Sequence, residues 1–360
     1  MHELILKNKW ESLNAVFGEI SGVQCVKNFG DSQKEISTLR SNAVFCDFSF
    51  TKKFIYDEND GLDFLDSILS ADILKLRYGK IANTILADDN GNVVADVFVA
   101  DIDDKLIVIA EEVSEGASAP LCSENSGATD ITTSHVLLSV DGVFAWKIAK
   151  DIFGSDILNL PFLSVEKYDF EGEDVYLLRS GKTGEYGYQF LAPNAIAEKL
   201  ADKIIESLNA HNGMLCGFDT HQTARLEGNF FNIYAEGKNV GCPLELGLQW
   251  TIDFEKESFI GSEKIFEKRQ NGLKRKLVGM KSSAPISVGE KIYDGDVCVG
   301  EIVSSAKSHI PNTFLATAIF DAEYVASGFA YARTPNGDED IQTVSRPPFI
   351  ALSLSTPMED

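Results

Sequence analysis

The chain has 360 residues, 44% of them hydrophobic, which is enough for two or three globular domains. Acidic residues outnumber basic ones by 55 to 32, and the formal net charge of -23 repels the phosphate backbone of nucleic acids and anionic membrane surfaces. We therefore expect neither nucleic acid nor a membrane as a partner.

Six cysteines are scattered along the chain and form no C-x-x-C pair. They are Cys25, Cys46, Cys122, Cys216, Cys242 and Cys298. Disulfide scaffolds and zinc ribbons need closer or patterned spacing, so we expect reduced, often buried thiols and no metal site. The N-terminal stretch lacks the apolar core of a secretory signal, and no apolar run approaches the ~20 residues of a membrane span. These features predict a cytoplasmic protein.

The first predicted elements are a helix and a strand. Residues 31–44 carry apolar positions at helical spacing and open with Asp31 or Ser32 as the expected N-cap. In the strand that follows, the alternation of side chains places Asp47 and Ser49 on the same face.

A helix and three antiparallel strands are predicted next. Residues 60–75 show helical periodicity, and apolar strands at 81–86 and 93–100 flank a turn at 88–92. The Asn-Gly pair in that turn is typical of a two-residue hairpin turn. With a third strand at 106–110, these elements predict a small α+β subdomain.

The middle of the chain alternates between polar loops and apolar elements. Residues 111–133 are rich in Ser, Glu and Gly, which predicts a helix start followed by an exposed loop. A strand at 136–140 precedes a helix at 143–152, and an amphipathic helix is predicted at 194–209.

A glycine-rich stretch at 179–190 lies between two predicted strands. Its glycines allow positive φ or a close backbone approach, and the aromatic residues after them alternate with the period of a strand. Taken alone, this stretch favours a structural hairpin over the wall of a ligand site.

Short strands dominate the C-terminal part. A mostly apolar run at 242–250, interrupted by Pro and Gly, predicts a buried connection, and a basic helix follows at 264–274. Strands are then predicted at 276–280, 290–293, 297–303, 315–319 and 345–354. This spacing is typical of a small β-barrel, so we divide the chain into domains at 1–269 and 270–360.

Four blocks of sequence carry a family resemblance. They are LRSNAVFCDFS, NGNVVADVFV, RSGKTGEYGYQF, and a long final block that includes RLEGNFFNIYAEG, PLELGLQWTIDF, RKLVGM and VGEIVSSAKSHIPNTFLATAIF. In this order they resemble the aminomethyltransferase, or T-protein, of the glycine cleavage system and its folate-binding relatives. The resemblance spans most of residues 30–350.

The resemblance implies a fold and a chemistry. The implied fold is α+β and T-protein-like, with two intertwined antiparallel α+β subdomains and a C-terminal β-barrel around a central cavity. The implied activity is one-carbon transfer to tetrahydrofolate as co-substrate, with a lipoyl carrier protein or a small methyl donor as partner.

Asp96 is the catalytic residue that the resemblance implies. Of the family's paired aspartates the second corresponds to Asp96, whereas the first is Ala95 here. From the residues alone, Asp96 shares a strand face with Val94 and Phe98, which puts a carboxylate among apolar neighbours. The alternative is an edge-strand aspartate in water or one that caps a neighbouring loop.

The resemblance also implies cofactor-binding positions. These are Asn83, Lys182, Gln189, His221 and Arg225. All but Arg225 differ from the family pattern: Asn83 and Lys182 replace tyrosines, Gln189 replaces a glutamate, and His221 lies where the family has R-D.

Structural alternatives exist for several of these residues. Arg225 is equally an ion-pair partner for Glu227 or Glu245. His221, in an expected polar loop, is more often only a solvated histidine. Trp250 and Tyr234 are more often core residues than a surface against which a ligand packs. His135 and His309 are too isolated in the sequence to indicate a metal site.

Three functions therefore compete. The first is a tetrahydrofolate-dependent aminomethyl or methyl transferase, the second a non-catalytic folate-binding or scaffold protein, and the third an O- or S-demethylase-type methyltransferase. One scaffold branch that assists iron-sulfur proteins carries a cysteine motif, and residues 256–263 have no cysteine at the matching place, which disfavours that branch.

Overall fold

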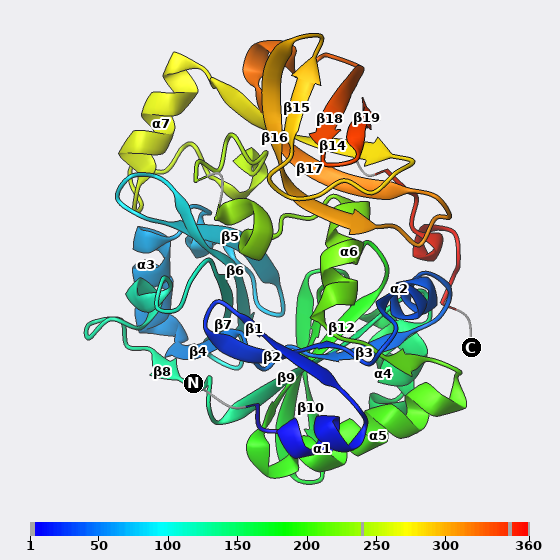
Figure 1. Ribbon diagram of the computed structural model, residues 1–360. Helices are drawn as coiled ribbons and strands as arrows, with labels where there is room; N and C mark the ends of the chain where they lie inside the picture. The colour runs from blue at the N-terminus through cyan, green and yellow to red at the C-terminus, as the bar shows by residue number, and fades with distance from the viewer. Residues whose placement is uncertain (1–3, 239–240, 345–347, 359–360) are drawn as a thin grey trace.

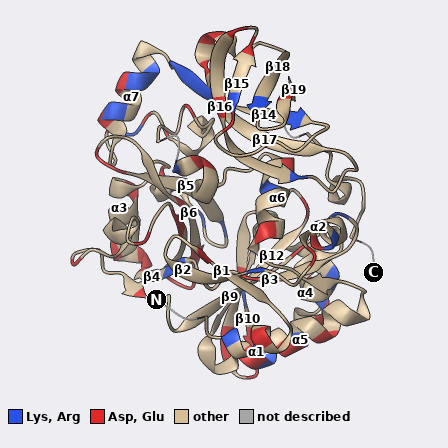
Figure 2. Cartoon of the chain, in the orientation of Figure 1, with Lys and Arg blue, Asp and Glu red and all other residues tan. Residues whose placement is uncertain are grey.

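The computed structural model describes residues 4–238, 241–344 and 348–358. It shows a six-stranded and a five-stranded β-sheet flanked by helices, a small two-stranded sheet, and a closed β-barrel beside them (Figure 1). None of the described helices is long and apolar enough to cross a membrane. Figure 2 shows acidic and basic residues interspersed along several elements, including the helix that precedes the barrel.

The six-stranded sheet carries the largest hydrophobic core. In spatial order its strands are β10 (Ser164–Phe170), β11 (Glu173–Arg179), β12 (Gly187–Pro193), β9 (His135–Asp141), β3 (Val44–Asp47) and β13 (Met214–Leu215). All neighbours are antiparallel except β13 with β3. The helices α4 (Ala145–Phe153) and α5 (Ala197–Ala210) pack on one face, where Phe153 stacks on Phe190.

The N-terminal elements are three that were not predicted, followed by the predicted helix. They are α1 (Lys7–Ser12), β1 (Val16–Ile20), β2 (Val23–Asn28) and α2 (Ser32–Ser41). The predicted helix and its cap are confirmed, because the Asp31 carboxylate accepts a hydrogen bond from Lys34 N at 3.0 Å. Ser49 lies just beyond β3, where its backbone N donates to Asp47 Oδ1 at 2.8 Å.

The five-stranded sheet contains the predicted hairpin. In spatial order its strands are β5 (Ile81–Ala87), β6 (Val93–Ile102), β7 (Lys105–Glu112), β4 (Lys52–Asp57) and β8 (Thr129–Asp130). The hairpin is confirmed, but its two-residue turn is wrong, because Ala87 pairs with Val93 and the loop spans 88–92. The Asp88 carboxylate closes this loop by accepting from the backbone N of Asn90 at 3.0 Å and of Asn92 at 2.8 Å.

Two predicted spans have different bounds in the structure. The helix expected over 60–75 is α3 (Glu58–Ile68), and it ends there because Leu69 bridges to Leu86 at the edge of β5. A separate 3₁₀ turn, η1 (Ile73–Lys75), follows. In the segment expected to be a helix start and loop, Glu111 belongs to β7 and is buried.

The remaining connections are short. The helices predicted at 143–152 and 194–209 are confirmed as α4 and α5, and 242–250 is confirmed as an irregular connection. The short helical turns are η2 (Ala119–Cys122), η3 (Ser155–Asn159), η4 (Asn194–Ile196), the π-helical η5 (Ile233–Gly237), η6 (Gln249–Thr251), η7 (Ala322–Tyr324) and η8 (Leu352–Leu354).

The barrel follows α6 (Phe218–Gly228) and α7 (Ser262–Asn271) in the chain. Its strands are β14 (Arg275–Ser282), β15 (Lys291–Asp294), β16 (Val297–Lys307), β17 (Phe314–Asp321), β18 (Phe329–Thr334) and β19 (Gly337–Thr343). The strand expected at 345–354 is wrong where that range is described: from 348 onward no strand forms, and Leu352 N and Ser353 N donate instead to the Glu185 carboxylate. Residues 345–347 lie outside the described residues.

A buried carboxylate joins the barrel to α6. Glu227 Oε1 accepts from Ser308 Oγ at 2.6 Å and from His309 N at 2.8 Å, and its Oε2 accepts from Arg40 Nε at 2.8 Å. The Arg40 guanidinium also lies 4.0 Å from the ring centroid of Phe349. Burial raises the pKa of Glu227, but the hydrogen bonds from His309 and the charge of Arg40 outweigh it and lower the pKa to about 2.

This carboxylate predicts a pH dependence of stability. Because the folded pKa lies below the ordinary value of 4.5, the stabilisation by Glu227 is full above pH 4.5 and is lost as the pH falls towards 2. We expect Glu227→Gln to lower the free energy of unfolding by roughly 3 kcal/mol at pH 7 and by much less at pH 3. Urea unfolding at both pH values measures this, with the exposed Glu257→Gln as control. An equal effect of Glu227→Gln at the two pH values would contradict the assignment.

Candidate functional site

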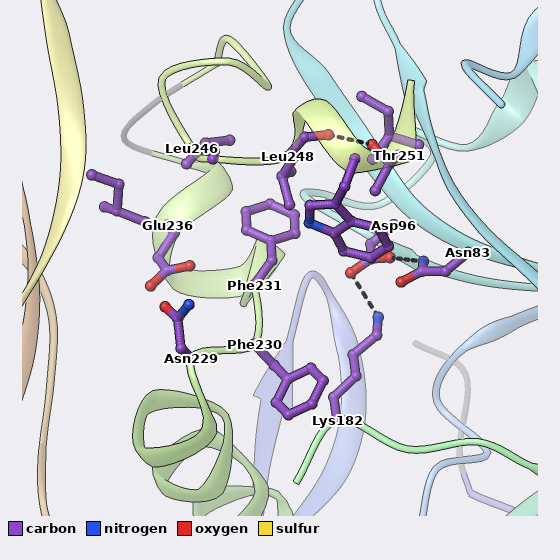
Figure 3. Close-up of a pocket in the computed structure, with 14 residues that line it drawn as sticks. Asn83, Asp96, Lys182, Asn229, Phe230, Phe231, Glu236, Leu246, Leu248 and Thr251 are labelled. Atoms are coloured by element: carbon purple, nitrogen blue, oxygen red, sulfur yellow. Dashed lines mark hydrogen bonds and ion pairs between the residues drawn. The ribbon is translucent and has the colours of Figure 1, made fainter. Parts of the chain in front are cut away.

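A cavity of about 430 Å³ opens between the five-stranded sheet, the turns after α6 and the barrel. Its polar side is formed by Asn83, Asp96 and Lys182, and its apolar side includes Phe230 and Phe231 (Figure 3). The first barrel strand, β14, contributes an apolar side chain to the same wall. The volume is within the range of small-molecule sites.

Asp96 is held at the cavity wall by two donors. It lies on β6, opposite Ile85 of β5, and is only 5% exposed. Asn83 Nδ2 donates to its Oδ1 at 2.9 Å, and Lys182 Nζ donates to its Oδ2 at 2.6 Å. With one donor on each oxygen, the carboxylate has a fixed orientation towards the cavity, and the alternative of a solvated edge aspartate is excluded.

Lys182 comes from the glycine-rich turn between β11 and β12. This turn requires glycine at two points: Gly184 has φ +86°, and a Cβ on Gly187 would lie 2.5 Å from the carbonyl oxygen of Ser180. The Lys182 ammonium donates to Glu111 Oε1 at 3.0 Å as well as to Asp96, and it lies 4.9 Å from the ring centroid of Phe98. Its charge is therefore shared between two carboxylates.

Glu111, which binds Lys182, is itself held by a second ion pair with Arg225. Arg225 NH1 lies 2.7 Å from Glu111 Oε2, and Arg225 NH2 donates to Glu111 Oε1 at 2.9 Å. Burial raises the pKa of Glu111, but the charges of Arg225 and Lys182 outweigh it and hold that pKa well below its usual range. The expectation that Arg225 pairs with Glu227 or Glu245 is wrong, because those carboxylates bind other arginines.

Gln189 and His221 are not among the described residues that line the cavity. Gln189 is buried in β12, where its Oε1 accepts from Ser180 Oγ at 3.0 Å. His221 is buried on α6, edge-on to Phe48 with ring centroids 4.7 Å apart. Burial, together with the charge of Arg225, lowers the pKa of His221 to about 3. The expectation of a solvated histidine in a polar loop is therefore wrong, because His221 is buried on a helix.

The comparison with protein families gives a match over most of the chain. The family model of the GCVT N-terminal domain matches residues 6–256. The chain belongs to this family. The predicted resemblance, made from four separate blocks, is thereby confirmed.

Named relatives of this GCVT family member are similar over nearly the whole chain. The aminomethyltransferase of Bacillus subtilis (strain 168) is 25% identical over 314 residues, which cover 85% of this chain and 87% of the relative. That of Listeria monocytogenes serotype 4a (strain HCC23) is 26% identical over 340 residues and covers 90% and 92%.

A solved structure confirms the fold. The glycine cleavage system aminomethyltransferase T from Bartonella henselae superimposes with a TM-score of 0.83 at 20% sequence identity. The match covers 97% of this chain and 98% of the other. The predicted T-protein-like α+β fold with its C-terminal barrel is therefore confirmed.

Several site features of this GCVT family member were missed or misplaced from the sequence. Trp250 was expected in the core, but it is 64% exposed and lines the cavity. Tyr234 packs edge-on against Phe218, with ring centroids 5.3 Å apart. Phe230 and Phe231 follow directly on the end of α6, and no spacing in the sequence signals that such a position lines a cavity.

Proposed function

We propose that this chain is a transferase that moves an aminomethyl or methyl group to tetrahydrofolate in the cavity beside Asp96. The observation that carries the proposal is the orientation of Asp96, whose two carboxylate oxygens are fixed by Asn83 and Lys182 in the wall of the cavity. Membership of the GCVT family and the names of the relatives support the reaction class.

The residues of the cavity fit a flat heterocycle. Phe230, Phe231 and Trp250 supply aromatic surface, while Asp96 and Asn83 supply hydrogen-bonding groups on the polar side. Tetrahydrofolate, when bound, supplies the nitrogen that accepts the one-carbon group.

Asp96 has two roles in this reaction, one electrostatic and one in proton transfer. A fixed carboxylate beside the acceptor nitrogen stabilises positive charge that develops there and is placed to receive the proton that the nitrogen loses. Lys182 and Asn83 keep this carboxylate from turning away, since each holds one of its oxygens. Arg225 and Glu111 position Lys182 in turn.

The one-carbon donor is the part of the proposal that an assay must decide. We propose a lipoyl carrier protein or a small methyl donor as the partner. If the partner is a lipoyl carrier protein, we expect one-carbon transfer from an aminomethyl-loaded carrier. If it is a small methyl donor, we expect transfer from an O- or S-methyl compound.

Calorimetric titration of the purified chain with tetrahydrofolate tests the proposal. We expect binding in the micromolar range. If tetrahydrofolate does not bind at concentrations up to roughly 1 mM, the transferase proposal is wrong.

One observation favours a second candidate, a folate-binding protein without transfer activity. The Lys182 ammonium lies 2.6 Å from Asp96 Oδ2 and so competes with a substrate nitrogen for that oxygen. Binding of tetrahydrofolate without turnover from either kind of donor would support this candidate over the enzyme.

The aromatic side of the cavity gives a separate prediction. Trp250 is 64% exposed, so Trp250→Ala removes a surface for the ligand without opening a hole in the core. We expect the Kd for tetrahydrofolate to rise roughly tenfold while the melting temperature stays unchanged. Phe162→Ala is the control, since that ring is 61% exposed and is not among the described residues lining the cavity. An unchanged Kd for Trp250→Ala would show that the ligand does not use this wall.

A further inference from the structure

The fold brings two distant cysteines and a histidine together in the interior. The ligand atoms of Cys46, Cys216 and His221 all lie within 4.8 Å of one another. All three residues are buried, with exposed fractions of 1%, 0% and 3%. None of them is among the described residues that line the cavity beside Asp96.

Strand register explains why the thiols meet. β13 runs parallel to β3 with Leu215 opposite Phe45, so the next residue on each strand, Cys216 and Cys46, are neighbours. The backbone N of Cys216 donates to Phe45 O at 2.9 Å, which continues the pairing to this point. His221 reaches the pair from the first turn of α6.

The polar groups of this site are incompletely satisfied. His221 Nε2 makes no hydrogen bond to any residue that the structure describes, although it is buried. The Asp141 carboxylate is too far for a hydrogen bond to this nitrogen, because its Oδ2 lies 3.7 Å away and accepts from Ser139 Oγ at 2.5 Å. Native proteins rarely leave a buried ring nitrogen without a partner, so this atom indicates a missing ligand.

We propose that Cys46, Cys216 and His221 bind a zinc ion. Two thiolates and an imidazole are soft and borderline ligands, which favour zinc over magnesium or calcium. Around a tetrahedral zinc ion, ligand atoms lie roughly 3.3–3.8 Å from one another, so side chains already within 4.8 Å need only a small inward movement.

The zinc ion has a structural role in this proposal. It joins the end of β13 and the first turn of α6, which are close in the sequence, to the distant strand β3. Arg225 lies one turn further along α6, where it binds Glu111. The ion therefore fixes the position of α6 and so of Arg225, which pairs with Glu111 behind Asp96. The expectation of no metal site came from the wide spacing of the cysteines in the sequence. The pairing of β13 with β3 brings two of these distant cysteines side by side.

Metal analysis of the full-length chain, purified from cells grown with added zinc, tests the proposal. We expect about one zinc ion per chain in the wild type and in Cys242→Ser, which replaces a buried cysteine that is not part of the cluster, and loss of zinc in Cys46→Ser and Cys216→Ser. The proposal would be overturned if the wild type held much less than one zinc ion per chain and the two serine variants held the same amount. Copper bound in place of zinc would also overturn it.

Two measurements on the wild type avoid variants that fail to fold. A chelator is expected to remove the zinc and lower the melting temperature by several degrees, with recovery when zinc is restored. Cobalt supplied in place of zinc during growth is expected to give thiolate-to-cobalt charge-transfer absorption. A Cys46–Cys216 disulfide found by mass spectrometry under non-reducing conditions, or a melting temperature indifferent to chelator, would overturn the zinc site.

Discussion

Replacement of Asp96 by asparagine is expected to abolish one-carbon transfer while tetrahydrofolate still binds in the micromolar range. The amide keeps the shape of the side chain but removes the negative charge that stabilises the reacting nitrogen. We expect the transfer rate to fall by at least about a hundredfold with little change in Kd. Single-turnover transfer and calorimetry on the same preparation separate the two effects.

Asp101→Asn is the matched control for this substitution. Asp101 lies on the same strand, is 4% exposed and is not among the described residues that line the cavity. It therefore reports the cost of removing a buried carboxylate from β6 without touching the site. Full transfer activity in Asp96→Asn, or equal losses in the two variants, would show that Asp96 has no part in the chemistry.

The second large effect is expected on stability, from the ion pair behind the site. Glu111→Leu leaves the Arg225 guanidinium, which is 2% exposed, without its carboxylate. Breaking one side of a buried ion pair costs about 3–5 kcal/mol, whereas replacing both partners with apolar side chains is often nearly neutral. We therefore expect Glu111→Leu alone to be strongly destabilised and the double variant with Arg225→Met to recover most of the loss.

A double-mutant cycle by urea unfolding measures this coupling. The two single variants and the double variant give the interaction free energy between Glu111 and Arg225. Lys182→Met serves as a further comparison, because Lys182 also contacts Glu111. Losses of the two single variants that simply add in the double variant would mean that the pair is not coupled.

Local signals in the sequence were enough to predict much of the fold. The Asp31 cap, the β5–β6 hairpin and the helices α4 and α5 follow from residues that are neighbours in the chain. The loop was correctly predicted at 88–92, but a two-residue turn was wrong, because the Asp88 side chain holds a longer loop than the Asn-Gly pair alone favours. β18 and β19 were missed because they are rich in charged or small residues and become strands only through barrel closure.

Less of the candidate site than of the fold could be predicted from the sequence. The resemblance pointed to Asn83, Asp96 and Lys182, and the structure brings these three together. Glu111 was missed, because its partners Lys182 and Arg225 are distant in the chain and no local pattern links them. Long-range pairs of this kind depend on which strands and helices pack against one another, and one sequence does not record that.

The attachment of Glu227 to the barrel bears on how this protein is dissected. A fragment that ends at residue 269 lacks Ser308 and His309, the donors that satisfy one oxygen of that buried carboxylate. The same cut removes Leu277 from the cavity wall. The N-terminal region and the barrel are therefore not interchangeable modules, and grafting a barrel from a relative onto this chain requires the Ser-His pair to come with it.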